Sequence, residues 1–265
     1  MNCQQPLNVH EINAQLTKKG FTTPYQLHVF SSINSTNTYL KNLANSEFLD
    51  ICCAEAQTQG KGRFGRQWNS PFGENIYCSS RWNLDADLGK LSGLSLISSL
   101  AVLATIKESK ANSDIQVKWP NDLLWQGKKL CGSLIEISTD PQQTAQVIIG
   151  IGLNVNSDTK NTQLAERPNC SLFEIFNHYF DRNVLIATLI MTLDAYINRF
   201  MHSGLEDFLD EWRQYDYLLH KQITVQQSVT TIAGIARGIN ELGQLILEEP
   251  SGQIHLLNSG DTSLA

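Results

Sequence analysis

The feature that most constrains the fold is a run of four strand-like segments in the middle of the chain. The segments are VKW at 117–119, DLLW at 122–125, KLCGSLIEIS at 129–138 and QVIIGIGLNV at 146–155. Turn signals such as Gln126-Gly127 separate them, and connections this short suit β-hairpins better than βαβ crossovers. The chain is therefore expected to build a sheet that is largely antiparallel or mixed.

Further strands are expected before this run, and helices on both sides of it. The strands are expected at 26–30, 49–56 and 74–82, and the helices at 39–44, 88–110, 184–200 and 205–215. The helix at 88–110 is the strongest, because its apolar residues recur at helical spacing. Ser171-Leu-Phe-Glu174 has the spacing of a helix capping box. Helices that cover a mixed sheet give an α+β fold.

The pattern changes near residue 221, where short alternating segments separated by Gly and Ser predict a small all-β module. We expect a leader over residues 1–23, a large domain over 24–218 and a small β domain over 219–265. A chain of 265 residues can support this organisation. The amphipathic segment Val9–Leu16 of the leader is either a relic or a helix that lies on the core.

The composition disfavours membrane and nucleic-acid-binding classes of protein. Its 42% hydrophobic and 17% charged residues are ordinary for a soluble globular protein. We find neither a signal peptide nor an uncharged apolar stretch of the ~18 residues that a spanning helix needs. We therefore expect a cytoplasmic location and no membrane partner. A net charge of −6 argues against general affinity for nucleic acid.

The six cysteines and six histidines show no metal-binding spacing. The cysteines contain no CxxC pair, and Cys52 and Cys53 are adjacent inside an apolar run that is typical of a buried strand. The histidines are scattered singly, without an HExxH motif. We expect free thiols in the core, and histidines with surface or packing roles.

The segment Gln57–Trp68 (QTQGKGRFGRQW) packs three glycines, three cations and a tryptophan into twelve residues. Glycines let backbone N–H groups approach a phosphate, and Lys61, Arg63 and Arg66 supply charge-assisted hydrogen bonds. Trp68 offers a face on which a nucleobase can stack. A nucleotide-binding loop, a solvated basic hairpin and an RNA-binding segment are all compatible with this composition alone.

A second motif, Lys118-Trp-Pro-Asn-Asp122, places an amide and a carboxylate at the end of a strand. An aspartate there can hold magnesium beside a triphosphate, although an ordinary hairpin turn is the more frequent explanation of a lone Pro-Asn-Asp. Lys129 follows at the start of the next strand. Its ammonium group could reach a reacting carboxylate and an α-phosphate, or be a surface charge.

Taken in order, the motifs resemble those of biotin protein ligases. They are STN at 35–37, QTQGKGRFGRQW at 57–68, SPFGENIY at 70–77, KWPND at 118–122, KLCGSLIE at 129–136 and GIGLN at 150–154. The resemblance runs from about residue 25 to the C-terminus, where ARG at 236–238 and GDTSL at 260–264 are similar to the family's SH3-like end domain. It implies a catalytic domain like those of class II aminoacyl-tRNA synthetases, followed by a small SH3-like β-barrel.

The resemblance also implies an activity. A biotin protein ligase uses ATP and Mg²⁺ to convert biotin to biotinyl-5′-AMP, and then transfers the biotinyl group to one lysine of a biotin carboxyl carrier protein. Family members with an N-terminal helix-turn-helix domain also repress biotin synthesis. Only about two dozen residues precede the first expected strand here, so we expect the monofunctional type without DNA binding. The sequence leaves open whether the chain forms a homodimer.

The family's site residues carry over position by position. Its biotin contacts would be Ser35, Thr36, Asn37, Gln57, Gly60, Lys61, Gly62, Arg63, Lys129, Gly132 and Gly152. Its ATP contacts would be Arg63, Arg66, Trp68, Asn121, Lys129 and Asn154. Lys129, Arg63 and Asp122 would act in catalysis, and Asp122 with Asn121 would hold the metal. Residues 60–63 would form a mobile loop over biotin and the adenylate, with Trp68 stacked on adenine.

Two positions depart from the family's pattern. Lys61 stands where many members have arginine, so the charge is kept but the bidentate fork is lost. Ser133 stands where an aliphatic residue is commoner, which places a hydroxyl group near the expected biotin tail.

Two alternative functions compete with the ligase. A lipoate or octanoate ligase or transferase has a similar fold but lacks the GKGRxGRxW and KWPND pair. A non-enzymatic nucleic-acid regulator would use the basic loop and an aromatic platform, and the acidic net charge weighs against it.

Overall fold

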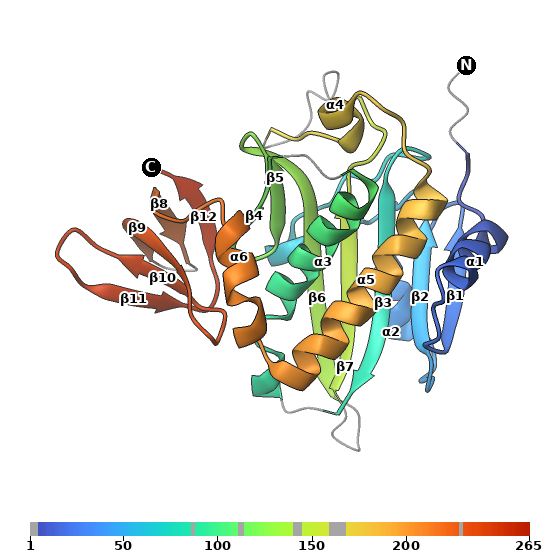
Figure 1. The fold of residues 1–265 in the computed structure, drawn as a ribbon, viewed down its shortest axis with the longest axis horizontal. Helices are drawn as coiled ribbons and strands as arrows, with labels where there is room; N and C mark the ends of the chain where they lie inside the picture. The colour runs from blue at the N-terminus through green and yellow to red at the C-terminus, as the bar shows by residue number, and fades with distance from the viewer. Residues whose placement is uncertain (1–4, 86–87, 111–113, 140–144, 159–167, 228–229) are drawn as a thin grey trace.

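The computed structural model describes residues 5–85, 88–110, 114–139, 145–158, 168–227 and 230–265 (Figure 1). Its larger part is a seven-stranded sheet in the order β1-β2-β3-β7-β6-β5-β4. The strands are β1 Tyr25–Phe30, β2 Leu49–Ala54, β3 Ile76–Leu84, β4 Ile115–Lys118, β5 Asp122–Trp125, β6 Lys128–Thr139 and β7 Ala145–Leu153. Only β1 and β2 pair in parallel, so the predicted mixed sheet is confirmed.

Helices cover both faces of this sheet. Figure 1 shows α3 Leu94–Ser109 and α5 Arg182–Ser203 side by side on one face, with α2 Thr36–Asn42 on the other. Shorter helices are α4 Leu172–Phe176 and α6 Leu209–Tyr215, with 3₁₀ turns η1 Arg63–Gly65, η2 Leu88–Leu91 and η4 Glu206–Phe208. The face under α3 and α5 forms the hydrophobic core, and the face under α2 carries polar side chains. This polar face is available for a site.

The helix expected over 88–110 is interrupted near its start. Gly93 has a φ of 98°, a left-handed conformation, and it separates η2 from α3. The expected helix over 205–215 likewise divides into η4 and α6. The capping box is borne out at its first residue, because the Ser171 side chain accepts a hydrogen bond from the backbone N–H of Glu174.

The N-terminal segment belongs to the folded core. Helix α1, Val9–Lys18, packs against α5 and buries Ile12 and Leu16. Asn8 caps it by accepting hydrogen bonds from the N–H groups of the first turn. Of the two roles considered for this amphipathic segment, a helix lying on the core is the one observed.

Helix α5 is the one described helix whose length and apolar composition would let it cross a membrane. It also packs against α1 and α3 and contributes Leu189, Leu193 and Ile197 to the core. This is the behaviour of a central helix in a globular domain. Cysteines 52, 53, 78, 131 and 170 are free and buried, as expected, and Cys3 lies outside the described residues.

The C-terminal part is a five-stranded antiparallel sheet in the order β11-β10-β9-β8-β12. Its strands are β8 Gln222–Gln226, β9 Thr231–Ile239, β10 Leu245–Glu248, β11 Ile254–Leu257 and β12 Asp261–Leu264. The predicted small β domain is thereby confirmed. It is held to the larger sheet by Thr262, whose carbonyl accepts from Lys118 Nζ at 2.6 Å and whose hydroxyl donates to the Trp119 carbonyl. The residues just before and along β12 therefore lie beside the end of β4.

Candidate active site

A pocket opens on the sheet face under α2, and its floor is made by neighbouring strands. Strand pairing places Asp122 of β5 beside Gly132 of β6, and Gly132 beside Gly152 of β7. Glycines at these two positions leave the floor without side chains. The next row pairs Leu134 of β6 with Gly150 of β7. The sheet thus provides a narrow trough whose width depends on three glycines.

One end of the trough is polar and is formed by the start of α2. Ser35 is the N-cap of this helix, and its hydroxyl accepts from the N–H of Thr38. The backbone N–H of Thr36 donates to Gln57 Oε1 at 2.9 Å. Gln57 Nε2 donates to the Ser70 hydroxyl at 3.1 Å, and that hydroxyl donates to the carbonyl of Trp68. The arrangement fixes the orientation of the Gln57 amide.

The segment 57–68 closes on itself as a small loop over the trough. Gly62 N–H donates to the Arg66 carbonyl at 2.7 Å, and Trp68 N–H donates to the Gly60 carbonyl at 2.9 Å. Phe64, at the tip, has a φ of 56° and is 65% exposed. A large apolar side chain held in solvent in this conformation indicates a loop shaped for a purpose other than core packing.

Arg63 ties this loop to two other parts of the chain. Its Nη1 donates to Asn121 Oδ1 at 3.0 Å, and its Nη2 donates to the Gly260 carbonyl at 3.4 Å. Burial lowers the pKa of the Arg63 guanidinium, and the nearby Asp122 carboxylate opposes that shift. An arginine pKa is so high that the side chain stays charged. The loop, the β4–β5 turn and the C-terminal domain therefore meet at one cation.

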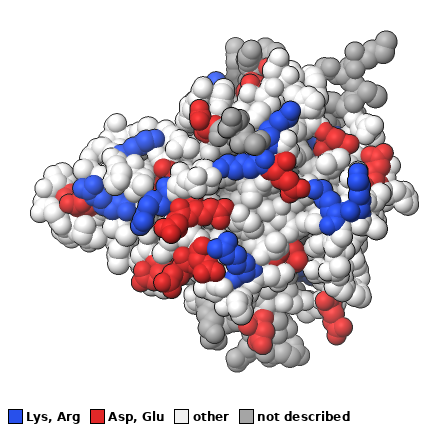
Figure 2. Space-filling view, viewed as in Figure 1, with Lys and Arg blue, Asp and Glu red and all other residues white. Residues whose placement is uncertain are grey.

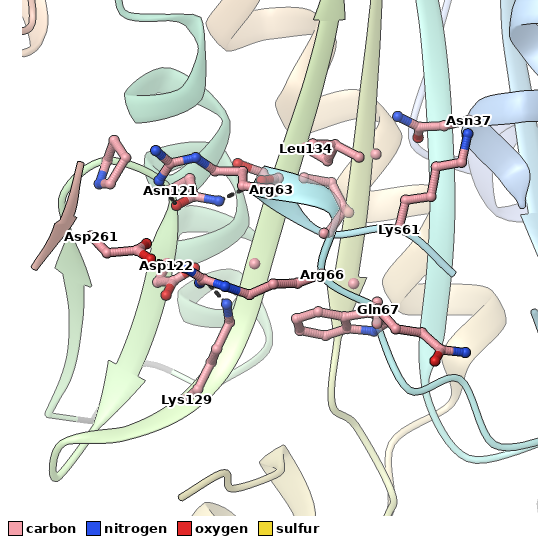
Figure 3. Close-up of a pocket in the computed structure, with 18 of the residues that line it drawn as sticks. Asn37, Lys61, Arg63, Arg66, Gln67, Asn121, Asp122, Lys129, Leu134 and Asp261 are labelled. Atoms are coloured by element: carbon pink, nitrogen blue, oxygen red, sulfur yellow. Dashed lines mark hydrogen bonds and ion pairs between the residues drawn. The ribbon is translucent and has the colours of Figure 1, made fainter. Parts of the chain in front are cut away.

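Cations and carboxylates alternate on this side of the pocket (Figure 3). Lys129 Nζ lies 2.8 Å from Asp122 Oδ1, and Arg66 forms an ion pair with Asp261. Figure 3 shows the charged ends of Arg66 and Lys129 close to Asp122, whereas Lys61 lies on the other side of the pocket. An anionic ligand could exchange with these carboxylates for the same cations.

Trp68 covers the glycine floor. A side chain at Gly152 would collide with the indole ring, and Gly132 is also in contact with it. The pocket measures about 120 Å³, whereas pockets for small ligands usually measure roughly 300–1,000 Å³. The indole Nε1 and the Ser133 hydroxyl are buried without a hydrogen-bond partner among the described residues. A ligand seated on the floor would therefore displace Trp68 and could satisfy both groups.

Most of the predicted site residues are brought together in this pocket. Those that line it are Ser35, Thr36, Asn37, Gln57, Lys61, Gly62, Arg63, Arg66, Trp68, Asn121, Asp122, Lys129, Gly132 and Gly152. Gly60 and Asn154 are not among the lining residues. Gly60 packs beneath the Trp68 carbonyl, and the Asn154 amide donates to the Cys170 carbonyl at 3.0 Å. In this structure both residues contact other parts of the chain and do not face the pocket.

Further lining residues are absent from the predicted contacts, although Ser133 is expected near the biotin tail. They are Gln67, Lys118, Trp119, Pro120, Ser133, Leu134, Gly150, Ile151, Gly260, Asp261 and Thr262. The last three come from the C-terminal domain, where GDTSL had been noticed only as a domain motif. Alternation along a strand could have identified Leu134 and Gly150, because they lie two residues from Gly132 and Gly152 and share their face.

Comparisons with known proteins agree over nearly the whole chain. Residues 29–154 match the family described as "Biotin/lipoate A/B protein ligase family", and residues 219–264 match "Biotin protein ligase C terminal domain". The Escherichia coli "Bifunctional ligase/repressor BirA" is 35% identical over 98% of this chain and 78% of its own length. The Mycobacterium tuberculosis "Biotin--[acetyl-CoA-carboxylase] ligase" is 29% identical over 97% and 95%.

Solved structures give the same result. The chain is similar to the biotin protein ligase from Aquifex aeolicus in complex with biotin and ATP, with a TM-score of 0.77 and 27% identity over 91% of this chain and 98% of that one. The two family matches, at residues 29–154 and 219–264, fall on the mixed sheet and on the small C-terminal sheet. On these grounds the chain belongs to the biotin protein ligase family.

Proposed function

We propose that this chain is an ATP-dependent biotin protein ligase that forms biotinyl-5′-AMP and transfers biotin to a lysine of a biotin carboxyl carrier protein. The observation that carries the proposal is the layout of the pocket. One end presents the hydroxyl and amide groups of Ser35, Thr36 and Gln57, and the other gathers Arg63, Arg66 and Lys129. A neutral polar ring fits the first end, and a carboxylate with phosphates fits the second.

The first step has to join two anions. The biotin carboxylate attacks the α-phosphorus of ATP, the bond to the β-phosphate oxygen breaks, and pyrophosphate leaves. Negative charge redistributes over the α-phosphate oxygens during the attack. Lys129 and Arg63 can neutralise this charge without moving far, because both already face the carboxylate of Asp122 or the turn beside it.

Asp122 and Asn121 differ in how well they suit the proposed Mg²⁺. Asp122 is a half-buried carboxylate that Lys129 neutralises, and Mg²⁺ is commonly held by one or two carboxylates together with substrate phosphates and water. The Asn121 amide oxygen accepts from Arg63, and its Nδ2 donates to the Ser133 carbonyl at 2.6 Å. Asp122 is thus the better ligand, and Asn121 chiefly orients Arg63. A bound Mg²⁺ would neutralise phosphate charge.

In the second step the amine of the acceptor lysine attacks the acyl carbonyl of the adenylate and releases AMP. Water would hydrolyse the mixed anhydride before that amine arrives if nothing covered it. The loop 57–68 can shield it, because the loop is closed by its own backbone hydrogen bonds and by the two contacts of Arg63.

The proposal is tested by exchange of labelled pyrophosphate into ATP, with biotin, lipoate and octanoate offered separately in the presence of Mg²⁺. We expect exchange with biotin alone, since adenylate formation is reversible and needs no acceptor protein. Omission of Mg²⁺ should abolish it. Exchange with lipoate or octanoate instead would move the chain to the sister activity, and no exchange with any acid would overturn the proposal.

Opening the loop should release the intermediate. The substitution Gly62→Pro removes the N–H that bonds to the Arg66 carbonyl, and the φ of −118° at this position does not suit proline. We expect free biotinyl-AMP to accumulate and bystander proteins to become biotinylated. Arg63→Gly should leak as well, with slower adenylation. Labelling confined to the carrier protein, as in the unaltered chain, would contradict the shielding role of the loop.

A nucleic-acid regulator is less well supported. All three cations of the loop 57–68, which a nucleic-acid regulator would use, line the pocket, and Arg66 is already paired with Asp261. Figure 2 shows acidic and basic side chains interspersed over the face that carries α3 and α5. We therefore propose a monofunctional enzyme. A DNA band shift that biotin does not affect would revive the alternative.

A further inference from the structure

A chain of hydrogen bonds leaves the polar end of the pocket and finishes at a carboxylate. Thr36 Oγ1 lies 2.6 Å from Ser79 Oγ, and the Ser79 hydroxyl donates to Asn37 Oδ1 at 2.6 Å. Asn37 Nδ2 donates to Glu136 Oε2 at 2.8 Å. Thr36, Ser79 and Asn37 are buried, whereas the Glu136 side chain is 28% exposed. Neither Ser79 nor Glu136 lines the pocket.

The Glu136 carboxylate fixes which group donates and which accepts at each step of this hydrogen-bond chain. An ionised carboxylate can only accept hydrogen bonds, so Asn37 must turn its Nδ2 toward Glu136 and its Oδ1 toward Ser79. Ser79 has one hydroxyl proton, and Asn37 Oδ1 takes it. The short contact between Ser79 and Thr36 can then be a hydrogen bond only if Thr36 donates. Glu136 thereby decides where the Thr36 proton points.

The consequence is felt at Gln57. Gln57 Oε1 accepts from the Thr36 backbone N–H, and it lies 3.1 Å from Thr36 Oγ1, close enough for the Thr36 hydroxyl to donate to it as well. The other end of the amide, Nε2, donates to Ser70. The Thr36 proton therefore has two competing acceptors, Gln57 Oε1 and Ser79 Oγ. With the Thr36 proton committed to Ser79, no proton lies between these two oxygens. Two acceptors side by side at the pocket wall suit a ligand N–H that both can share.

We propose that Glu136 is a positioning residue which, through Asn37 and Ser79, holds the Thr36 hydroxyl as an acceptor for an N–H of the substrate. This inference rests on the proposed function, because the ureido ring of biotin supplies such an N–H, whereas the acyl chain of octanoate and the dithiolane of lipoate do not. Glu136 would thus help to determine specificity without touching the substrate.

Neighbouring residues restrict the side chains that form this hydrogen-bond chain. Gly150 lies against Asn37, and any side chain at position 150 would collide with Asn37 Oδ1. Lys41 Nζ lies 3.8 Å from Glu136 Oε1, the oxygen that Asn37 does not use. Strand pairing places Glu136 on the same face as Gly132 and Leu134, so β6 carries both the pocket floor and the end of the chain.

The test compares Glu136→Met, which removes the acceptor at similar length, with Glu136→Gln, which keeps an acceptor oxygen. In Glu136→Met the Asn37 amide can rotate by about 180°, so Ser79 no longer has to donate to it. The Thr36 hydroxyl can then donate to Gln57 Oε1 instead of to Ser79. We expect KM and Kd for biotin to rise about tenfold, the value of one hydrogen bond, with kcat little changed. Glu136→Gln keeps an acceptor oxygen but also brings an N–H group, so it should lose less affinity than Glu136→Met, and Ser79→Ala should resemble Glu136→Met.

The relative affinities of two lactam analogues of biotin, each with one ureido N–H replaced by CH₂, give a second test. A purely structural role of Glu136 would not change the ratio of these affinities. The unaltered chain should bind one of them about tenfold more weakly than the other. Glu136→Met and Ser79→Ala should remove that difference. Lys41→Met, which changes only the outer neighbour of Glu136, should keep it. Thermal unfolding of each variant checks the fold.

The outcomes separate the two proposals. If the unaltered chain shows no exchange with biotin, the proposed function fails whatever the variants do. If the unaltered chain is active but Glu136→Met keeps both its biotin affinity and its preference between the lactams, the positioning role of Glu136 is overturned. Equal losses in Glu136→Gln and Glu136→Met would also overturn it, because the retained acceptor would then not matter.

Discussion

Replacing Lys129 with alanine is expected to lower the rate of biotin-dependent pyrophosphate exchange by about 10²- to 10³-fold. The expectation follows from the position of the ammonium group, which lies 2.8 Å from Asp122 Oδ1 and faces the pocket. Few preorganised hydrogen-bond donors lie near the charge that develops on the α-phosphate, and the substitution removes the Lys129 ammonium group entirely. Exchange and single-turnover formation of biotinyl-AMP measure the effect on the chemical step directly.

The neighbouring lysine provides a matched control. Lys128 is exposed and pairs with Trp125 in the same hairpin, so Lys128→Ala removes the same charge from the same strand but not from the pocket. Its exchange rate should stay within about twofold of the unaltered chain, as expected for a surface charge. Circular dichroism should show both variants folded. Normal turnover by Lys129→Ala would remove this residue from the chemistry.

The fold was predictable where local sequence determines it. The Gln126-Gly127 hairpin is an example, because both residues take positive φ values of 49° and 77°, as a two-residue turn between strands requires. The break at Gly93 was missed, since the apolar repeat continues through it and a glycine in a helical pattern gives no clear sign of its conformation. The packing of α1 on α5 depends on a partner about 170 residues away, as the Asn8–Asn183 hydrogen bond shows.

The site was predictable where a motif carries its own chemistry. Glycine and cation spacing marked the loop 57–68, and the strand-end position marked Asp122. The contributions of Gly260 and Asp261 could not be read from local patterns, because they depend on how the C-terminal sheet docks beside β4. Glu136 ends the KLCGSLIE motif, but the sequence does not indicate its role, because its connection to Thr36 runs through two intervening side chains.

The second large effect is expected on stability, from the buried ion pair of Arg81 and Asp50. The Arg81 side chain is 1% exposed and donates to Asp50 Oδ2 at 2.6 Å. It also donates to the carbonyls of Leu40, Leu43 and Ala44, which follow or end α2. Arg81→Met would leave a buried carboxylate and three carbonyls without this donor. We expect a loss of about 3–5 kcal/mol in the free energy of unfolding, measured by urea denaturation.

An exposed pair gives the control for this prediction. Lys19 and Glu108 form an ion pair at 2.6 Å with side chains 26% and 56% exposed, so Lys19→Met should cost less than about 1 kcal/mol. A comparable loss in both variants would show that burial of the Arg81 pair is not the cause.

The double variant Asp50→Leu/Arg81→Met separates the two parts of the loss. Removing the unpaired carboxylate as well should restore some stability, because a buried charge without a partner is the larger penalty. The loss in free energy of unfolding that the double variant retains is due to the carbonyls at the end of α2. Since α2 also carries Thr36 and Asn37 at its other end, that variant should bind biotin more weakly even where it is fully folded. Stability at one end of this short helix and substrate recognition at the other would then be linked through the helix itself.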